Sequence, residues 1–459
     1  MTSDPKHPET NLSAQYLEKL DLLIAAAKKA GADASDAMIY SGQSESVSWR
    51  LGKLEDVERA ESTDLGLRVF VGKKQAIVSS SDISNAVFDT LALRAVDMAK
   101  NAPEDPYAGL ADPALLALKS ATIPELDLYD DTEKSADELK ELARTIEGVA
   151  LGVSGITNSE GASAGSSKGL IATANSNGFA GSYSSSHFSL SLSVIAGSDA
   201  AMERDYAYSS KRHFADLRDP VAIGQEAAEK ALRRLGPRKA KTGQVPVIFD
   251  PRVSRTLLGH LAGAINGQGI ARGTSFLKDH MGGKIFKNGI AVIDDPHILR
   301  GPSSKPFDGE GCCNGRLDII VDGILQCWTL DSASARQLGL ASNGRASRGT
   351  SSPPSPSSTN LYMANGTLSP KELMQDIKSG LYVTDLIGMG VNGITGDYSR
   401  GASGFWIEEG KITYPVNEIT IAGNLKDMFL NMTAADDLVI KYGTDAPTLR
   451  IDGIMIAGE

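Results

Sequence analysis

The residues of this chain that could hold a metal ion are few and widely spaced. His260 lies in an apolar stretch that predicts a helix over 252–264. A helical zinc site needs a second ligand about one turn away, but Thr256 and Ala264 occupy the positions four residues before and after His260. A lone histidine in such a helix is usually a packed or hydrogen-bonded core residue. The helix therefore predicts no metal site by itself.

The remaining candidate groups also lack partners at useful spacing. His280 and His297 stand in irregular, glycine-rich sequence and are expected at the surface. The adjacent pair Cys312 and Cys313 cannot readily reach the tetrahedral positions that a Cys-x-x-Cys pair supplies, so buried structural thiols are expected. The segment 388–393 has G-x-G-x-x-G spacing without a strand–helix unit around it, which favours a tight turn. We predict no catalytic residue and no metal ligand in this chain.

The elements that would position these residues begin with an α+β unit. Helical spacing runs from Tyr16 to a stop at Gly31, after a polar leader. Strand-like runs and a further helix should complete the unit by about residue 110. The strands are predicted at 36–50, 64–71 and 75–79, and the helix at 81–100.

The middle of the chain predicts a second unit. The proline-rich stretch 102–127 is predicted to be a linker or irregular connection between the two units. A charged helix is predicted at 132–151. Between 188 and 194, apolar residues alternate with serines, which indicates a strand with one buried face. An amphipathic helix at 221–235 then leads to a boundary near residue 240.

The remainder is glycine-rich and predicts many short strands and few helices, the clearest at 252–264 and 370–379. We therefore predict an α+β fold with an N-terminal α/β-type domain and a β-rich C-terminal domain. The predicted divisions are a polar leader 1–15, an N-terminal domain 16–110, a central domain 111–240 and a C-terminal domain 241–459. The C-terminal strands are predicted at 245–249, 317–321, 404–407, 411–416 and 448–456.

Charge and composition narrow the class of partner. The formal net charge of -11 disfavours binding to nucleic-acid phosphates. The densest basic cluster, 233–241, lies at the end of a helical pattern, where the helix dipole favours cations. No stretch is long and apolar enough for a membrane span or a secretory signal. Three cysteines cannot complete a disulfide framework, so a reducing, cytoplasmic compartment is expected.

Three segments of the C-terminal half resemble the TldD/PmbA family, in its PmbA (TldE) branch, earlier described as modulators of DNA gyrase. They are Gly-His-Leu-Ala-Gly-Ala-Ile at 259–265 with Gly-Thr-Ser-Phe-Leu at 273–277, the Pro-rich segment 352–363, and the long segment 396–425. The resemblance extends over the whole chain and implies a C-terminal domain of the TldD/PmbA type.

The resemblance also implies what this chain lacks. In the family, the TldD partner holds zinc through a helical His-Glu-x-x-x-His motif and a later cysteine, and the glutamate is suited to act as general base. Here no glutamate follows His260, the helix has no second histidine, and no cysteine stands after residue 330. We therefore expect no cofactor in this chain and zinc in the partner subunit. The helix that matches the metal motif is therefore degenerate in this chain, and its residues at the motif are Gly259, His260, Gly263 and Ala264.

The implied function is that of a non-metal-binding, non-catalytic subunit, inactive alone. It would pair with a TldD-like zinc subunit in a peptidase that degrades or processes short or unfolded peptides. An alternative is an autonomous adaptor or regulatory protein that modulates DNA gyrase or a toxin–antitoxin system, and an independent peptidase with unrecognised ligands is a third. Edge strands near 352–363 and 396–406 are expected to pair with a peptide backbone. The candidate cleft residues are Ser352, Pro353, Pro354, Asn360, Asp397, Tyr398, Ser399, Arg400 and Gly401.

Overall fold

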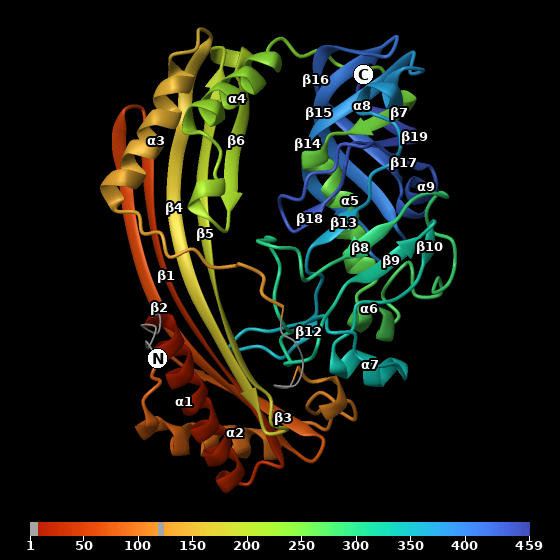
Figure 1. Cartoon of the computed structure of the whole chain (residues 1–459). Helices are drawn as coiled ribbons and strands as arrows, with labels where there is room; N and C mark the ends of the chain where they lie inside the picture. The colour runs from red at the N-terminus through yellow and green to blue at the C-terminus, as the bar shows by residue number, and fades with distance from the viewer. Residues whose placement is uncertain (1–7, 118–123) are drawn as a thin grey trace, which may run out of the picture.

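The computed structural model describes residues 8–117 and 124–459 (Figure 1). The first helix, α1 (Pro8–Ala30), begins earlier than the predicted Tyr16 and includes part of the polar leader. The rest of that leader, 1–7, and residues 118–123 of the predicted connection lie outside the described residues.

A single antiparallel sheet of six long strands forms the N-terminal half, in the order β3-β2-β1-β4-β5-β6. Its central pair joins β1 to β4, from Asp36 opposite Asn175 to Trp49 opposite Ala162. The residues on the two sides of the predicted division at 110 therefore share one sheet. The strands are β1 (Ala34–Arg50), β2 (Lys53–Val71), β3 (Lys74–Ser80), β4 (Ile156–Asn175), β5 (Ala180–Ala196) and β6 (Glu203–Lys211).

Four helices cover one face of this sheet. Ala37 and Val47 of β1 both point to that face because their positions differ by an even number and side chains alternate along a strand. Ala37 packs with α1 and α2 at one end, and Val47 packs with α3 and α4 at the other. The opposite face is turned toward the C-terminal half (Figure 1). The helices after α1 are α2 (Phe88–Asn101), α3 (Ala136–Leu151) and α4 (Pro220–Arg233).

The C-terminal half contains a second six-stranded sheet, ordered β16-β15-β14-β7-β19-β17. A smaller five-stranded sheet, ordered β10-β9-β8-β13-β18, stands beside it. The larger sheet consists of β7 (Gly243–Phe249), β14 (Ser379–Val391), β15 (Asp397–Glu408), β16 (Lys411–Asn424), β17 (Met432–Ala434) and β19 (Leu449–Ala457). The smaller one consists of β8 (Val292–Asp294), β9 (Leu317–Val321), β10 (Ile324–Leu325), β13 (Leu361–Met363) and β18 (Thr444–Asp445), and a separate pair joins β11 (Ala346–Ser347) to β12 (Ser355–Pro356).

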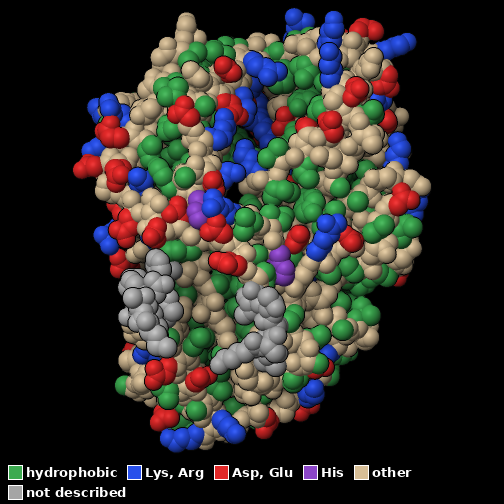
Figure 2. Space-filling model, in the orientation of Figure 1, with side chains coloured by type: hydrophobic (Ala, Val, Ile, Leu, Met, Phe, Trp, Pro, Cys, Tyr) green, Lys and Arg blue, Asp and Glu red, His purple; other side chains and the backbone are tan. Residues whose placement is uncertain are grey.

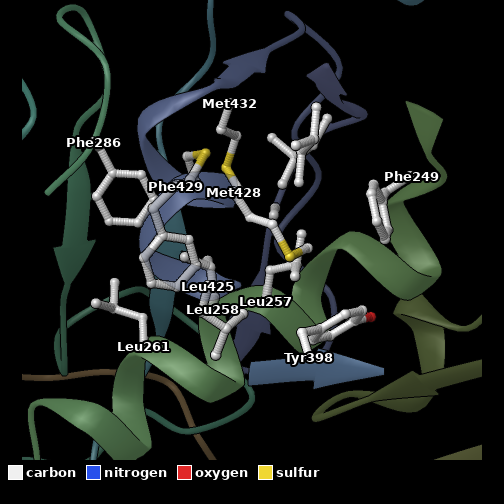
Figure 3. Close-up of a cluster of buried hydrophobic side chains, with 14 of the residues drawn as sticks. Phe249, Leu257, Leu258, Leu261, Phe286, Tyr398, Leu425, Met428, Phe429 and Met432 are labelled. Carbon is white, nitrogen blue, oxygen red and sulfur yellow. The ribbon is translucent and has the colours of Figure 1, made fainter. Parts of the chain in front are cut away.

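The largest apolar core lies between these C-terminal elements, around helix α5 (Pro251–Ala264). Leu257, Leu258 and Leu261 of α5 point into it, where they meet Phe286 and Phe429 (Figure 3). The predicted α+β class is confirmed, although the predicted helix 370–379 is only five residues long. The other C-terminal helices are α6 (Gly267–Ala271), α7 (Ser332–Leu338), α8 (Pro370–Met374) and α9 (Leu425–Leu430). Within the described ranges, no helix has the length and apolar character needed to cross a membrane.

Candidate functional site

Helix α5 fixes the position of His260. Asp250 caps its N-terminus by accepting a hydrogen bond from the amide of Arg252, and Pro251 occupies the first turn, where a missing amide hydrogen costs nothing. The leucine face of the helix is buried, whereas Gly259 and Gly263 are exposed on the other side. His260 lies between these faces and is half-buried.

His260 and Tyr398, which are 138 positions apart in the numbering and lie on α5 and β15, contact each other edge to face. Their ring centroids are 5.9 Å apart and the ring planes are inclined by 80°. Neither His260 Nε2 nor the Tyr398 hydroxyl has a hydrogen-bond partner among the described residues, although both atoms are buried. Buried polar atoms are nearly always paired. These two atoms could therefore bind a group that comes from outside the chain.

Arg400 supplies positive charge next to this pair. Burial lowers the pKa of His260, and the Arg400 guanidinium lowers it further. Burial raises the pKa of Tyr398 to about 12, so its hydroxyl keeps its proton at neutral pH. The site therefore combines a neutral imidazole, a phenol and a guanidinium. This arrangement can donate or accept hydrogen bonds and can bind an anion.

The residues around His260 do not match a zinc site. A catalytic zinc ion needs three protein ligands, and the residue after His260 is leucine. The nearby positive charge of Arg400, which already disfavours the imidazolium, would also repel a zinc ion. Among the described residues, the one group of three potential ligands that could hold a metal ion is elsewhere and does not include His260.

The structure brings only part of the predicted cleft together. Tyr398 and Arg400 approach His260, whereas Ser399 is exposed. Asp397 accepts hydrogen bonds from Thr395 in the β14–β15 connection and from Asn424 of β16. β15, which also contains Gly401, lies between β14 and β16. The prediction of an edge strand at 396–406 is therefore wrong, because the strand pairs along both sides.

The Pro-rich segment 352–363 also forms only part of the predicted cleft. Ser352 and Pro353 are exposed, and Pro354 is buried. Asn360 is only 1% exposed and bonds to the main chain of Ser303 and Asp295, so it holds loops together and cannot line an open cleft as it stands. Strand β13 is interior to its sheet, so the expected edge is wrong for 361–363, whereas β12 pairs only with β11 in a two-stranded sheet.

Three other sequence expectations change. His297 bonds to Asn314 and is half-buried, and His280 is also half-buried, so neither is the surface residue expected. Cys312 is buried as predicted, but Cys313 is exposed.

A buried group of Asp308, Glu310 and Cys312 was not predicted from the sequence. Asp308 accepts hydrogen bonds from the amides of Glu310, Cys312 and Ala346, and these bonds fix the conformation of its loop. Burial raises the pKa of Glu310 to about 7, and neighbouring Asp308 adds to that effect. The alternate spacing Asp-x-Glu-x-Cys is the sequence signal that could have identified the group.

Three consecutive ranges of the chain match the domains of a metallopeptidase family. Residues 35–101 match PmbA/TldA metallopeptidase domain 1, residues 129–235 the central domain, and residues 242–458 the C-terminal domain. Because these matches cover most of the chain, it belongs to the PmbA/TldD family.

Individual relatives agree with this assignment. The chain is 41% identical to Metalloprotease PmbA of Escherichia coli O157:H7, over 93% of each chain. A crystal structure of a putative modulator of DNA gyrase from Bacteroides thetaiotaomicron superposes with a TM-score of 0.88 and 28% identity, over 96% of this chain and 98% of that one. TldE from Thermococcus kodakarensis shares the fold, with a TM-score of 0.84 and 21% identity, over 96% and 100%. A protease-type role is thus supported at the level of the family.

Proposed function

We propose that this chain is the TldE-like, non-metal-binding subunit of a two-subunit zinc metallopeptidase. In this proposal a TldD-like subunit holds the zinc, and the complex degrades or processes short or unfolded peptides. The present chain encloses the site and limits entry to flexible chains, and it is inactive alone.

The observation that carries the proposal is the composition of the site around His260. The helix that resembles the family's metal motif keeps one histidine, but its other donors are replaced by leucine and small residues. A buried Tyr398 hydroxyl and the cation Arg400 stand beside it. A phenol and a guanidinium are suited to hydrogen bonding with a partner or a substrate, and both are poor ligands for zinc.

The exposed tip of the β14–β15 hairpin supports a partnership. Ile387, Met389 and Ile394 are 66%, 90% and 62% exposed, although large apolar side chains are usually covered. Arg400 donates a hydrogen bond to the carbonyl of Ile387, so this tip adjoins the His260 site. We assign the tip, defined by these three apolar residues, to the interface with the TldD-like subunit, whose docking would cover it.

Metal analysis and reconstitution test the proposal. The chain purified alone should contain well under one zinc ion per molecule and should not cleave casein. Mixing it with the TldD-like subunit from the same cell should give cleavage of an unstructured peptide that the metal subunit alone does not achieve. A mixture in which the motif glutamate of the metal subunit is replaced by glutamine serves as the inactive control.

Two outcomes would contradict the proposal. One is stoichiometric zinc in this chain that resists gentle chelation and is lost in His260→Ala. The other is equal activity of the metal subunit with and without this chain, when both are folded. The second outcome would favour the adaptor alternative.

A further inference from the structure

A cavity of about 800 Å³ lies between the N-terminal sheet and the C-terminal half. Its walls come from β6, the loop 298–303, helix α5 and the segment 440–442. Strand β6 is the last strand of its sheet and pairs only with β5. A second cavity of about 390 Å³ shares the lining residues Tyr208, Lys441 and Tyr442 with the first. The first, larger cavity is called the trough below.

Positive charge gathers in this trough although the whole chain is acidic. Figure 2 shows Lys and Arg side chains in the hollow between the two halves of the molecule. Within the described part of the chain, four cations that line the larger cavity form no salt bridge with a carboxylate. They are Lys211, Arg212, Arg255 and Lys441. The lining residues Arg300 and Asp216, by contrast, neutralise each other.

The contacts of these cations leave their charge available. Arg255 lies 4.3 Å from the ring centroid of Tyr442, and Lys441 lies 4.9 Å from that of Tyr208. Arg212 donates to main-chain carbonyls only. Partial burial lowers the pKa of Lys441, and neighbouring cations such as Lys211 add to that effect, although Glu226 opposes it. An anion in the trough would relieve this repulsion between cations.

The shape of the site indicates which anion fits. A phosphate group is usually held by main-chain amides that converge on one point. Here the amides of Gly301 and Ser303 in the wall already donate to Ile298 and Asn360. The cations instead come from separate segments of the cavity wall, and the rings of Tyr208 and Tyr442 lie beside Lys441 and Arg255. An extended chain that carries several carboxylates matches this distribution, because its aliphatic parts can lie against the rings.

We propose that this trough binds an acidic peptide segment, with Lys211, Arg212, Arg255 and Lys441 as the carboxylate-binding residues. The inference does not depend on the proposed partner, because the site consists entirely of residues of this chain. It can therefore be tested without the zinc subunit.

Fluorescence anisotropy with a labelled hexaglutamate peptide and the purified full-length chain tests the site directly. The glutamate peptide should bind at low ionic strength, and a hexaglutamine peptide of the same length should bind at least about tenfold more weakly, because charge contributes most of the attraction. The double variant Lys211→Gln/Lys441→Gln should lose about tenfold in affinity. The matched control, Lys371→Gln/Lys378→Gln, makes the same charge change on exposed residues outside the trough and should stay within about twofold.

Circular dichroism establishes that the variants remain folded, and Arg255→Gln provides a second, independent variant. Equal binding of the glutamate and glutamine peptides, or equal losses in the trough and control variants, would overturn the assignment. Displacement of the peptide by inorganic phosphate at comparable concentration would show a phosphate site instead and would also overturn it.

Discussion

Arg348, in the loop after β11, donates a hydrogen bond to the carboxylate of Asp36 on β1, 312 positions earlier in the chain. Arg68 of the adjacent strand β2 bonds to both oxygens of the same carboxylate. The side chains of all three residues are almost completely buried. The Asp36 carboxylate thus pairs with one guanidinium of its own sheet, and through the guanidinium of Arg348 it joins the N-terminal sheet to the C-terminal half.

Replacement of Asp36 by asparagine should destabilise the chain by about 3–5 kcal/mol, because two buried cations would lose their counter-charge. Urea denaturation followed by circular dichroism measures the change. Asp56→Asn, on an exposed part of β2, is the matched control and should change the free energy of unfolding by less than about 0.5 kcal/mol. Similar losses in both variants would contradict the importance of this ion cluster.

The Asp36 cluster should also depend on pH. Burial alone would raise the pKa of Asp36, but Arg348 and Arg68 outweigh it and hold the pKa below the ordinary value of 3.8. The stabilisation is therefore complete above that ordinary value and is lost as the pH falls through the lower folded-state pKa. Wild-type chain and Asp36→Asn should accordingly converge in stability on acidification. A difference that stays constant down to the acid transition would contradict this expectation.

Gly66 should tolerate no side chain. A Cβ atom at this position of β2 would lie 2.1 Å from the carbonyl oxygen of Thr350, in the loop that contains Arg348. Gly66→Ala should cost about 3 kcal/mol, at the upper end of the range for overpacking. Gly259→Ala is the control, since a Cβ there meets open space in a helix, and it should stabilise by about 0.5–1 kcal/mol. Thermal melting should show a lower melting temperature for Gly66→Ala and a slightly higher one for Gly259→Ala than for the wild-type chain.

The charge of Arg400 should be visible in the titration of His260. Arg400→Gln should raise the pKa of His260, because it removes a cation that opposes protonation. NMR titration of the histidine rings measures this value, and Lys371→Gln on α8 should leave it unchanged. An unaltered His260 pKa in Arg400→Gln would show that the two groups do not interact.

Met389→Glu should weaken binding to the TldD-like subunit by about tenfold or more, because a charged group would be buried at the interface. The stability of the chain alone should not change, since Met389 is 90% exposed. Leu93→Glu on α2 is the control, because Leu93 is also exposed but lies far from the hairpin in the sequence. Unchanged affinity for Met389→Glu would place the interface elsewhere.

Local sequence pattern predicted the elements better than their contacts. The alternation around Phe188 predicted the middle of β5, and β1 was predicted to within a few residues. The first half of β2 was missed, because residues 53–62 are exposed and carry no apolar alternation. The short helix α8 was predicted too long, since it ends at Met374.

The candidate site could be predicted only in part. His260 and Tyr398 were both singled out, but in separate groups, because nothing local indicates that α5 and β15 bring them together. The edge strands were misjudged for the same reason. Whether β15 pairs along one side or both depends on β14 and β16, and strand order is a property of the whole sheet.

The pairing of β1 with β4 has a consequence for synthesis of the chain on the ribosome. Thr173 of β4 donates a hydrogen bond to the carbonyl of Ala37 of β1, which lies 136 positions earlier in the chain. At ordinary translation rates the β1–β2 hairpin would wait on the order of ten seconds for the strand that completes it. During that interval β1 presents a long open edge, which other nascent chains could join. We expect the newly made hairpin to depend on ribosome-associated chaperones until β4 emerges.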